Sequence, residues 1–138
     1  MAGFRFAYRT SGGQPTIKSI LYKDTETLSK GDIANLESGT VDLGATADTN
    51  LLGVILNTQA GTSGVTKAEV ITDADAVYEV TDANARNAGA TLDLTGSTGA
   101  QGVTTSSNKE FVVVATKTSS QKTLVRFNVG KHHENVAL

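Results

Sequence analysis

Two adjacent histidines, His132 and His133, are the only imidazoles in the chain, and there is no cysteine. Imidazole is the commonest general base in enzymes. Without a positioned histidine or cysteine, the chain offers few groups for a nucleophile–base pair. Neighbouring residues of a strand point to opposite faces, so the two rings could not serve one site. We expect a frayed C-terminal segment here. The sequence therefore predicts no catalytic residue and no enzyme.

Two carboxylates, Asp73 and Asp75, lie on one face if the chain around them is extended, because side chains in a strand alternate. Such a pair could contribute to a Ca²⁺ site, since calcium takes several oxygen ligands. The spacing of an EF-hand loop is missing, however, and this pattern between two strands is more often a solvated turn. We predict no metal site and keep calcium as the alternative.

Residues 93–102 read DLTGSTGAQG and could be mistaken for a phosphate-binding loop. The run lacks the Gly-Lys-Ser/Thr ending of such a loop, and no helical pattern follows it. We interpret it as a hairpin loop and predict no cofactor. Sugar-binding sites usually present exposed Trp or Tyr. The chain has no tryptophan and three tyrosines, so that signal is weak.

The elements around these residues have a hydrophobic period of two, which predicts strands. Clusters of Gly, Asp, Asn, Ser and Thr separate the strands and predict turns. The expected strands are 16–22, 33–37, 39–43, 51–57, 67–72, 76–81, 89–94, 101–105, 110–116 and 123–129. A single short helix is expected over 82–88, between Thr81 and Gly89 as caps. The prediction is an all-β fold, a small barrel or sandwich of short antiparallel strands, with one short helix and an extended N-terminal arm.

The arm is residues 1–15, divided from a β-rich domain of residues 16–138 by the sequence GGQP. Its aromatic and basic residues alternate, which predicts one aromatic and one basic face in an extended arm. They are Phe4, Arg5, Phe6, Tyr8 and Arg9. Disordered tails are poor in aromatics, so the arm should pack on something. It either folds back as a strand of its own domain or contacts a neighbouring subunit or capsid protein by strand addition.

Charge is distributed unevenly along the 138 residues, whose net charge is −2. Residues 24–110 hold 13 acidic and four basic residues, whereas both ends are basic. An acidic centre argues against nucleic acid, which requires a basic face. No apolar run is long enough to span a membrane, and the N-terminus does not resemble a signal peptide. Basic ends could either be solvated surface or orient docking on an acidic neighbour.

The middle of the chain resembles the head decoration proteins of tailed bacteriophages, also called cement or head-stabilising proteins. Residues 29–44 and 50–57 carry the first part of the resemblance, with the sequences SKGDIANLESGTVDLG and NLLGVILN. Residues 70–80 and 82–93 carry the second, with VITDADAVYEV and DANARNAGATLD. The resemblance covers roughly residues 28–103.

The resemblance implies a structural virion protein without catalytic residues, seated on the outer surface of the capsid. It implies the major capsid protein as partner, association as a homotrimer on the shell and an N-terminal arm that contacts the shell. The lack of cysteine and of a signal peptide predicts synthesis in a cytoplasm, which for a phage protein is that of the host. The alternative is a β-sandwich module that binds receptor or carbohydrate on a phage tail or cell surface. An enzyme, which would need a pocket with a perturbed pKa, is the third hypothesis.

Overall fold

Short antiparallel strands make up most of the described chain. The computed structural model describes residues 3–23, 27–57, 59–60, 67–82, 84–105, 107–117 and 121–132. The strands are β1 (Phe4–Arg9), β2 (Ile17–Leu21), β3 (Thr27–Leu28), β4 (Ile33–Glu37), β5 (Thr40–Leu43), β6 (Leu51–Val54), β7 (Gln59–Ala60), β8 (Lys67–Ile71), β9 (Ala76–Thr81), β10 (Thr91–Thr95), β11 (Gly102–Thr105), β12 (Phe111–Lys117) and β13 (Lys122–Phe127). Within these ranges there is no helix, and hence none long and apolar enough to cross a membrane.

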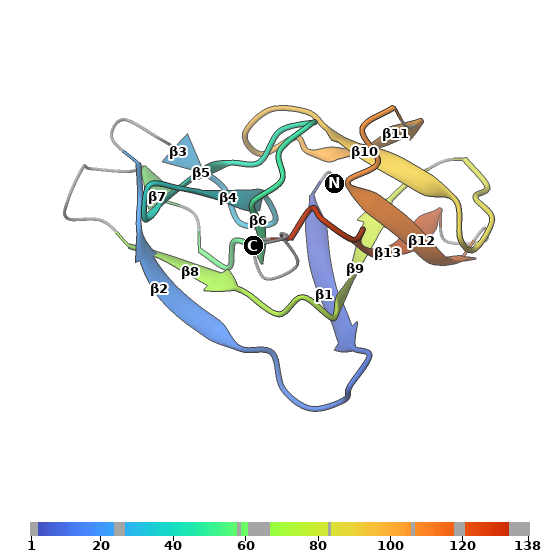
Figure 1. Cartoon of the computed structure of the whole chain (residues 1–138), viewed down its shortest axis with the longest axis horizontal. Helices are drawn as coiled ribbons and strands as arrows, with labels where there is room; N and C mark the ends of the chain where they lie inside the picture. The colour runs from blue at the N-terminus through green and yellow to red at the C-terminus, as the bar shows by residue number, and fades with distance from the viewer. Residues whose placement is uncertain are drawn as a thin grey trace.

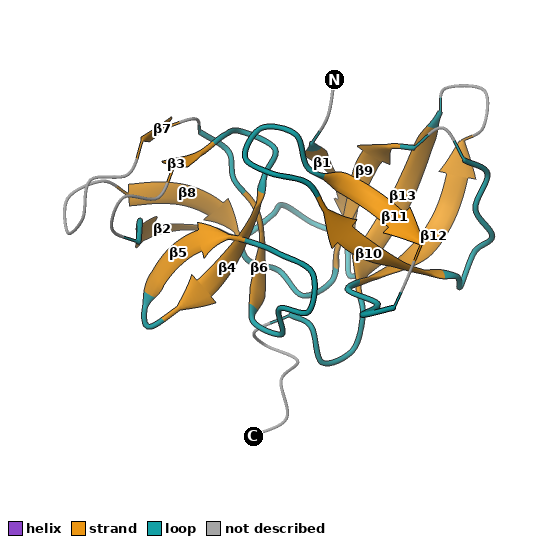
Figure 2. Ribbon diagram, turned by 90° about the horizontal axis from the view of Figure 1, so that it is seen from above, coloured by secondary structure: helices purple, strands orange, loops and turns teal. Residues whose placement is uncertain are grey.

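The strands form two halves packed in a sandwich-like arrangement (Figures 1 and 2). One half is a six-stranded sheet in the order β1-β9-β13-β12-β10-β11. The other contains the sheet β5-β4-β6 and the pairs β2–β8 and β3–β7. A bridge between Ile55 and Val70 joins β6 to β8, and a bridge between Tyr22 and Val41 joins the end of β2 to β5. The second half therefore nearly closes on itself.

The chain crosses between the halves through two neighbouring connections, residues 10–16 and 72–75. Strand β1 belongs to the six-stranded sheet, β2–β8 build the other half, and β9 returns to the first. The two connections are tied together, since Thr72 N donates to Thr16 O at 3.0 Å and Thr10 N donates to Asp75 O at 3.0 Å. The beginning of the described chain is thus part of the half that is completed last.

Two hydrophobic cores lie on opposite faces of β6. Leu51 and Val54 pack in the first core, against the six-stranded sheet, whereas Leu52 and Ile55 pack in the second. Pairing with β4 shifts register at this point, with Ala34 opposite Gly53 and Asn35 opposite Leu51. The bulge places residues three apart on the same face. It explains why the continuous apolar run of this strand is buried on both sides.

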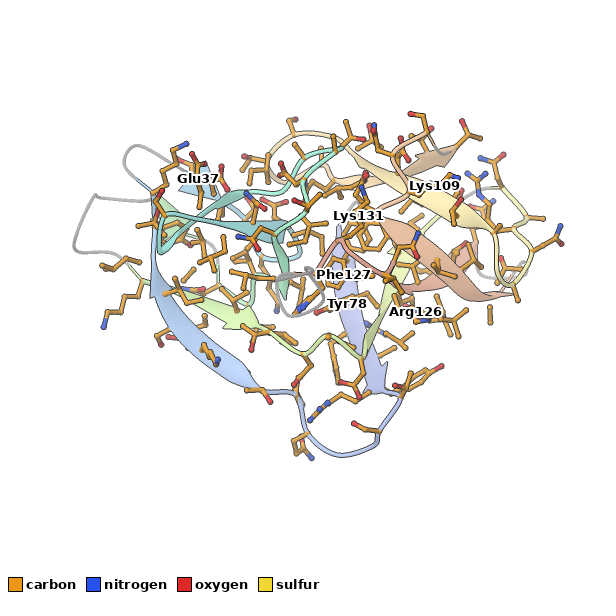
Figure 3. The ribbon with its side chains drawn as sticks, in the orientation of Figure 1. Glu37, Tyr78, Lys109, Arg126, Phe127 and Lys131 are labelled. Atoms are coloured by element: carbon orange, nitrogen blue, oxygen red, sulfur yellow. The ribbon has the colours of Figure 1, made fainter. Side chains whose placement is uncertain are left out.

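The first core contains most of the aromatic side chains. Phe127 stacks on Phe111 with ring centroids 5.3 Å apart and contacts Tyr78 edge-on at 5.8 Å. Both Tyr78 and Phe127 lie at the centre of the molecule (Figure 3). Aromatic pairs in these geometries add to the free energy gained from burying their area. This cluster joins β9, β12 and β13 across the inner face of the sheet.

The all-β prediction is confirmed, and each of the ten predicted strands corresponds to an observed one. The turn at Ser38 and Gly39 has φ values of 51° and 80°. Two residues with positive φ match a type I′ hairpin, whose twist suits antiparallel strands. Two very short strands, β3 and β7, were not predicted.

The helix expected over 82–88 is wrong for the described residues, which are Asp82 and 84–88. The Asp82 carboxylate accepts a hydrogen bond from Asn84 N at 3.1 Å and from Arg86 Nε at 2.7 Å. A side chain that binds its own backbone in this way competes with helix formation. At the end of the segment, Gly89 N donates to Val113 O at 2.8 Å and so ties the backbone to β12.

The strand predicted over 123–129 extends too far at its C-terminal end. Strand β13 ends at Phe127, and Val129 lies in a turn, 81% exposed. The turn forms because Asn128 Oδ1 accepts a hydrogen bond from Val129 N, while Asn128 N donates to Glu110 O.

Candidate functional site

The five residues predicted to contact a neighbour lie in strand β1, which pairs with β9 of the same chain. The register places Phe4 opposite Val80 and Phe6 opposite Tyr78. Phe4 is only 4% exposed, and its ring stacks on Phe111. Of the two arrangements left open by the sequence, the structure has the strand of its own domain. An arm over residues 1–15, separate from the body, is thus corrected for residues 4–9.

The predicted alternation of an aromatic and a basic face also fails, because β1 contains a bulge. The register shifts between Phe6 and Tyr8, so that Tyr8 lies opposite Val77 and Arg9 opposite Ala76. Directly paired residues share a face of the sheet, so the extra residue moves Tyr8 to the face opposite Phe6. Tyr8 is accordingly 43% exposed, whereas Phe6 is half-buried.

Arg9, at the end of β1, binds both carboxylates of the predicted acidic pair. Its Nε lies 2.9 Å from Asp75 Oδ1, and its Nη2 lies 3.5 Å from Asp73 Oδ1. Asp73 also accepts from Thr16 N at 2.6 Å, and Asp75 accepts from both Ser11 N and the Ser11 hydroxyl. The Ser11 hydroxyl is the largest cause that lowers the pKa of Asp75 to about 2. These carboxylates hold the two connections between the halves together.

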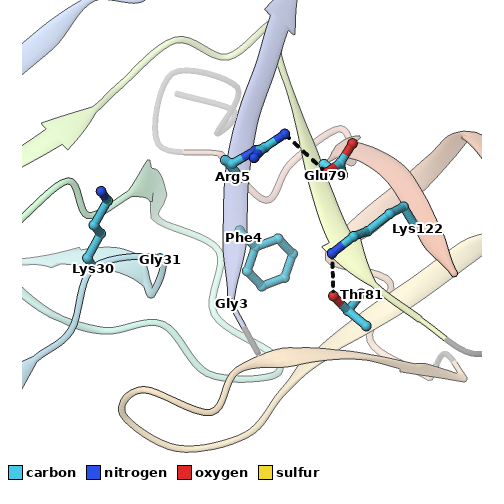
Figure 4. Close-up of a pocket in the computed structure, with 8 residues that line it drawn as sticks. All are labelled: Gly3, Phe4, Arg5, Lys30, Gly31, Glu79, Thr81 and Lys122. Carbon is cyan, nitrogen blue, oxygen red and sulfur yellow. Dashed lines mark hydrogen bonds and ion pairs between the residues drawn. The ribbon is translucent and has the colours of Figure 1, made fainter. Parts of the chain in front are cut away.

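A pocket of about 470 Å³ lies beside β1 (Figure 4). Its residues come from β1, from the turn before β4, from β9 and from β13. They are Gly3, Phe4, Arg5, Lys30, Gly31, Glu79, Thr81 and Lys122. The pocket therefore gathers three cations and one acid from four segments that are far apart in the sequence. We call it the basic pocket.

The register of the sheet explains why these side chains meet. Arg5 lies opposite Glu79, and Lys122 lies opposite Thr81, so all four project from one face. Arg5 Nη2 is 3.5 Å from Glu79 Oε1, and Lys122 Nζ donates to Thr81 Oγ1 at 2.8 Å. The pairs are asymmetric in exposure, since the Arg5 side chain is 82% exposed and that of Glu79 only 15%. The cation is therefore the part that solvent or a partner meets.

The floor of the basic pocket requires two glycines. Gly3 and Gly31 have φ values of +107° and +96°, and a Cβ built on Gly3 would lie 3.4 Å from Gly31 O. Phe4 N also donates to Gly31 O at 2.8 Å. Side chains at either position would be strained by the backbone conformation. This close approach joins the first strand of one half to the turn before β4 of the other.

A buried polar network fixes the turn before β4. The Gln101 side chain accepts from Ile33 N and donates to Gly44 O, both at 2.7 Å, and the Asp32 carboxylate accepts from Gly99 N at 2.9 Å. Burial raises the pKa of Asp32, although the N–H groups of Ser29 and Gly99 oppose this shift. The glycine-rich run is a hairpin loop between β10 and β11, as predicted, and it packs on the other half through these bonds.

Two further buried acids bind backbone N–H groups. Asp93 Oδ1 accepts from the N–H groups of Ser107, Asn108 and Lys109. Burial alone would raise the pKa of Asp93, but these three hydrogen bonds lower it below its ordinary value. Glu110 Oε1 accepts from Leu94 N at 2.9 Å. Asp93 therefore holds the loop between β11 and β12 in place, and Glu110 binds strand β10; both roles are structural.

His132 is fully buried, and the expectation of a frayed segment is wrong at this position. Its Nε2 lies 2.8 Å from Leu52 O, and its ring centroid is 5.3 Å from that of Phe127. Leu51 N also donates to Lys131 O at 2.9 Å. The segment after β13 is thus bound to the opposite half. His133 lies outside the described residues.

The sequence identified Phe4 and Arg5 but not the other residues of the basic pocket. Lys30, Glu79 and Lys122 meet through sheet register and through the contact between the halves, neither of which leaves a local motif. The one sequence feature that pointed to a basic surface was the excess of basic residues at both ends of the chain. No protein-family model matches this sequence, and no curated protein matches it either.

Proposed function

We propose that this chain is a non-catalytic structural protein of a phage virion that binds the outer surface of the assembled capsid and stabilises the head. Its partner is the major capsid protein, on which it sits as a homotrimer after synthesis in the host cytoplasm. The proposal combines the sequence resemblance over roughly residues 28–103 with the position of the basic pocket. Those residues contribute strands to both halves of the molecule, so the resemblance is not confined to one of them.

The observation that supports a binding function best is the concentration of positive charge in the basic pocket. The whole chain carries a net charge of −2, yet Arg5, Lys30 and Lys122 converge here around one acid. A local field of this kind gives a protein one preferred orientation on an acidic partner surface. A decoration protein needs such an orienting surface on a rigid body.

Rigidity is supplied by the buried acids and amides. Asp93 holds the loop between β11 and β12, and Glu110 binds strand β10. Asp32 and Gln101 join the two halves, and Arg9 binds Asp75 where the chain crosses between them. A rigid binding surface loses little conformational entropy on docking. These carboxylates are engaged with backbone donors or arginine, so their chemistry is accounted for by the fold.

Binding to the assembled shell stabilises it by linkage. A protein that binds the lattice but not the loose subunit stabilises the lattice in proportion to RT ln(1 + [L]/Kd) per site. Contacts with two capsid subunits at once add to this through effective concentration. The proposed function therefore requires a compact body and a specific surface, and it requires no bound cofactor.

Heat resistance of emptied heads tests the proposal. Expanded, emptied heads of the phage that encodes the chain are heated with and without a saturating amount of the protein, and shell disassembly is followed by light scattering. We expect disassembly at a higher temperature with the protein, and no effect on unassembled capsid subunits. An unchanged disassembly temperature at saturating protein would contradict the proposal.

The receptor- or carbohydrate-binding alternative receives less support from the aromatic residues. Sugars stack on exposed aromatic rings, but Tyr22 and Tyr78 are buried, and both Phe111 and Phe127 lie in the first core. Tyr8 is the most exposed of the three tyrosines, at 43%.

A further inference from the structure

We infer that the basic pocket is a receptor for the carboxylate of an aspartate or glutamate side chain on the capsid protein. This inference rests on the proposed function and names the chemistry of the partner at the point of contact. Its basis is the geometry of Arg5 and Lys122, their exposure, and the floor formed by Gly3 and Gly31.

The charge of the pocket lining favours an anionic ligand. The pocket holds Arg5, Lys30 and Lys122 against Glu79, so its lining is cationic overall. Arg5 reaches Glu79 through Nη2 at 3.5 Å. A guanidinium has five N–H donors in a planar fork that matches a carboxylate. A second carboxylate arriving from outside would meet the exposed side of this group.

Each of the two cations has one polar contact within the pocket. Glu79 is largely buried beneath Arg5, and Thr81 Oγ1 accepts from Lys122 Nζ at 2.8 Å. Figure 4 shows both contacts on the same side of the pocket. Anchoring by neighbouring side chains reduces the entropy that a long cationic side chain loses on binding. These contacts direct both cations to the same side of the pocket, where an arriving anion would meet them together.

Exposure decides between a free anion and a side chain of a bound protein. Arg5 is 82% exposed, so its attraction for a small dissolved carboxylate is screened by water and salt. A carboxylate on a capsid subunit that is already docked through other contacts acts at a high effective concentration instead. The volume of about 470 Å³ is ample for one acidic side chain together with the chain segment that carries it.

The first test compares two double variants on emptied, expanded heads. Arg5→Gln with Lys122→Gln removes two charges from the basic pocket and retains much of both aliphatic stems. Lys18→Gln with Lys67→Gln is the matched control, because it removes two exposed charges from the β2–β8 pair. Head occupancy is measured against protein concentration at low and at physiological salt, and thermal melts verify that each variant is folded.

We expect the pocket variant to bind about tenfold more weakly at low salt, and the control to stay within about twofold of the unmodified chain. The difference should shrink as salt increases. Equal binding by the pocket variant and the unmodified chain would overturn the inference while leaving the proposed function intact. An equal loss in the control would also overturn it, because the effect would then be general charge.

If the pocket double variant does not fold, Lys30→Gln alone repeats the comparison from the turn before β4, with Lys18→Gln as its control. The expected loss is then about threefold. Sedimentation of the free proteins tests whether the pocket binds a second copy of this chain instead. If the pocket substitutions change self-association and not head binding, the pocket binds a second copy, and the inference is wrong.

A second measurement does not depend on heads. The blocked peptide Ac-Ala-Glu-Ala-Glu-Ala-NH2 is titrated into the ¹⁵N-labelled chain at low salt, where screening is weakest, and at peptide concentrations up to roughly 10 mM to compensate for the low effective concentration of a free ligand. The amide shifts of Gly3 and Gly31 are followed. Saturable shifts that are lost in the pocket variant support the carboxylate receptor even if the unmodified chain fails to bind heads, in which case the proposed function alone is wrong. No shift with the peptide and no head binding would overturn both.

Discussion

The ring of Phe4 stacks on the ring of Phe111, with centroids 5.2 Å apart and planes inclined by 26°. This contact joins the first strand of the chain to β12, more than 100 residues later in the sequence. It shows that β1 is part of the first core. Changes at the N-terminal end should therefore act on folding as well as on binding.

Phe4→Ala should destabilise the chain by about 3–5 kcal/mol, because it removes a large buried side chain and leaves a cavity. Tyr8→Ala, on the same strand but largely exposed, should cost less than about 1 kcal/mol. Urea unfolding, followed by far-UV circular dichroism because the chain has no tryptophan, gives the free energy of unfolding of both variants. Equal costs for the two variants would show that β1 does not pack as described.

Deletion of residues 2–13 follows the same logic and removes strand β1 entirely. We expect a chain that is unfolded or melts far below the full-length protein, since β9 loses its neighbour and the first core loses Phe4 and Phe6. Thermal melts of the free proteins measure this. A deletion variant that melts like the full chain would mean that the arm is separate from the body after all.

The strands and turns could be predicted from the sequence because their causes are local. The apolar pattern identified 33–37 and 76–81 with their observed bounds. The cluster Glu37-Ser38-Gly39 predicted a turn, which the structure has at Ser38 and Gly39. The fate of residues 4–9 could not be predicted, since pairing with β9 depends on residues some 70 positions away. The bulge at Ala7, which moves Tyr8 to the other face, leaves no signal in the alternation either.

The basic pocket could be predicted only in part for the same reason. Arg5 was identified from its place between two aromatics. Lys122 reaches the pocket through the register of the six-stranded sheet, and Lys30 reaches it through the contact of the two halves. His132 was misjudged because its position near the end of the sequence suggested fraying. The bond to Leu52 O, which buries it, comes from the other half of the molecule.

Gln101→Ala should cost about 2–4 kcal/mol, since it leaves Ile33 N–H and Gly44 C=O without partners in a buried position. Gln14→Ala is the control, because Gln14 is exposed and should change stability by less than about 0.5 kcal/mol. Both are measured by urea unfolding at neutral pH. A cost for Gln101→Ala no larger than that of the control would show that the amide does not join the halves.

Asp75→Asn should lower stability at neutral pH, and its effect should fade as the pH falls through 2. The pKa of Asp75 is about 2 in the folded protein, below its ordinary value of 3.8, so the ionised carboxylate stabilises the fold. That stabilisation is complete above about pH 4 and is lost as the pH falls through 2. Melting temperatures of both proteins across this range give the test. A difference that persists unchanged at the lowest pH would contradict the assignment.

Asp42→Asn should show the opposite pH dependence. Burial first, and then the neighbouring Glu37 carboxylate, raise the pKa of Asp42 to about 6, while Asn35 and Lys23 oppose the shift. The folded state therefore holds this proton more tightly than the unfolded state. The contribution of Asp42 to stability should fall as the pH rises from about 4 to 6.

The Asp42→Asn variant lacks this titration, so it should gain stability relative to the unmodified chain at pH 7.5 and differ least at pH 4. Urea midpoints at the two pH values are sufficient. The loss of stability between pH 4 and pH 7.5 is compared in the two proteins. An equal loss in both would show that Asp42 does not cause the pH dependence.

The central claim is that this chain binds the assembled phage head, and the most direct measurement is occupancy at saturation. Increasing amounts of the purified chain are mixed with expanded, emptied heads, the heads are sedimented, and the bound copies per capsid subunit are counted. We predict saturable binding at a fixed ratio to the capsid subunits, with bound copies grouped in threes at symmetry positions of the shell when decorated heads are imaged. Heads that sediment without the protein, at concentrations far above those used to saturate a specific site, would contradict the account.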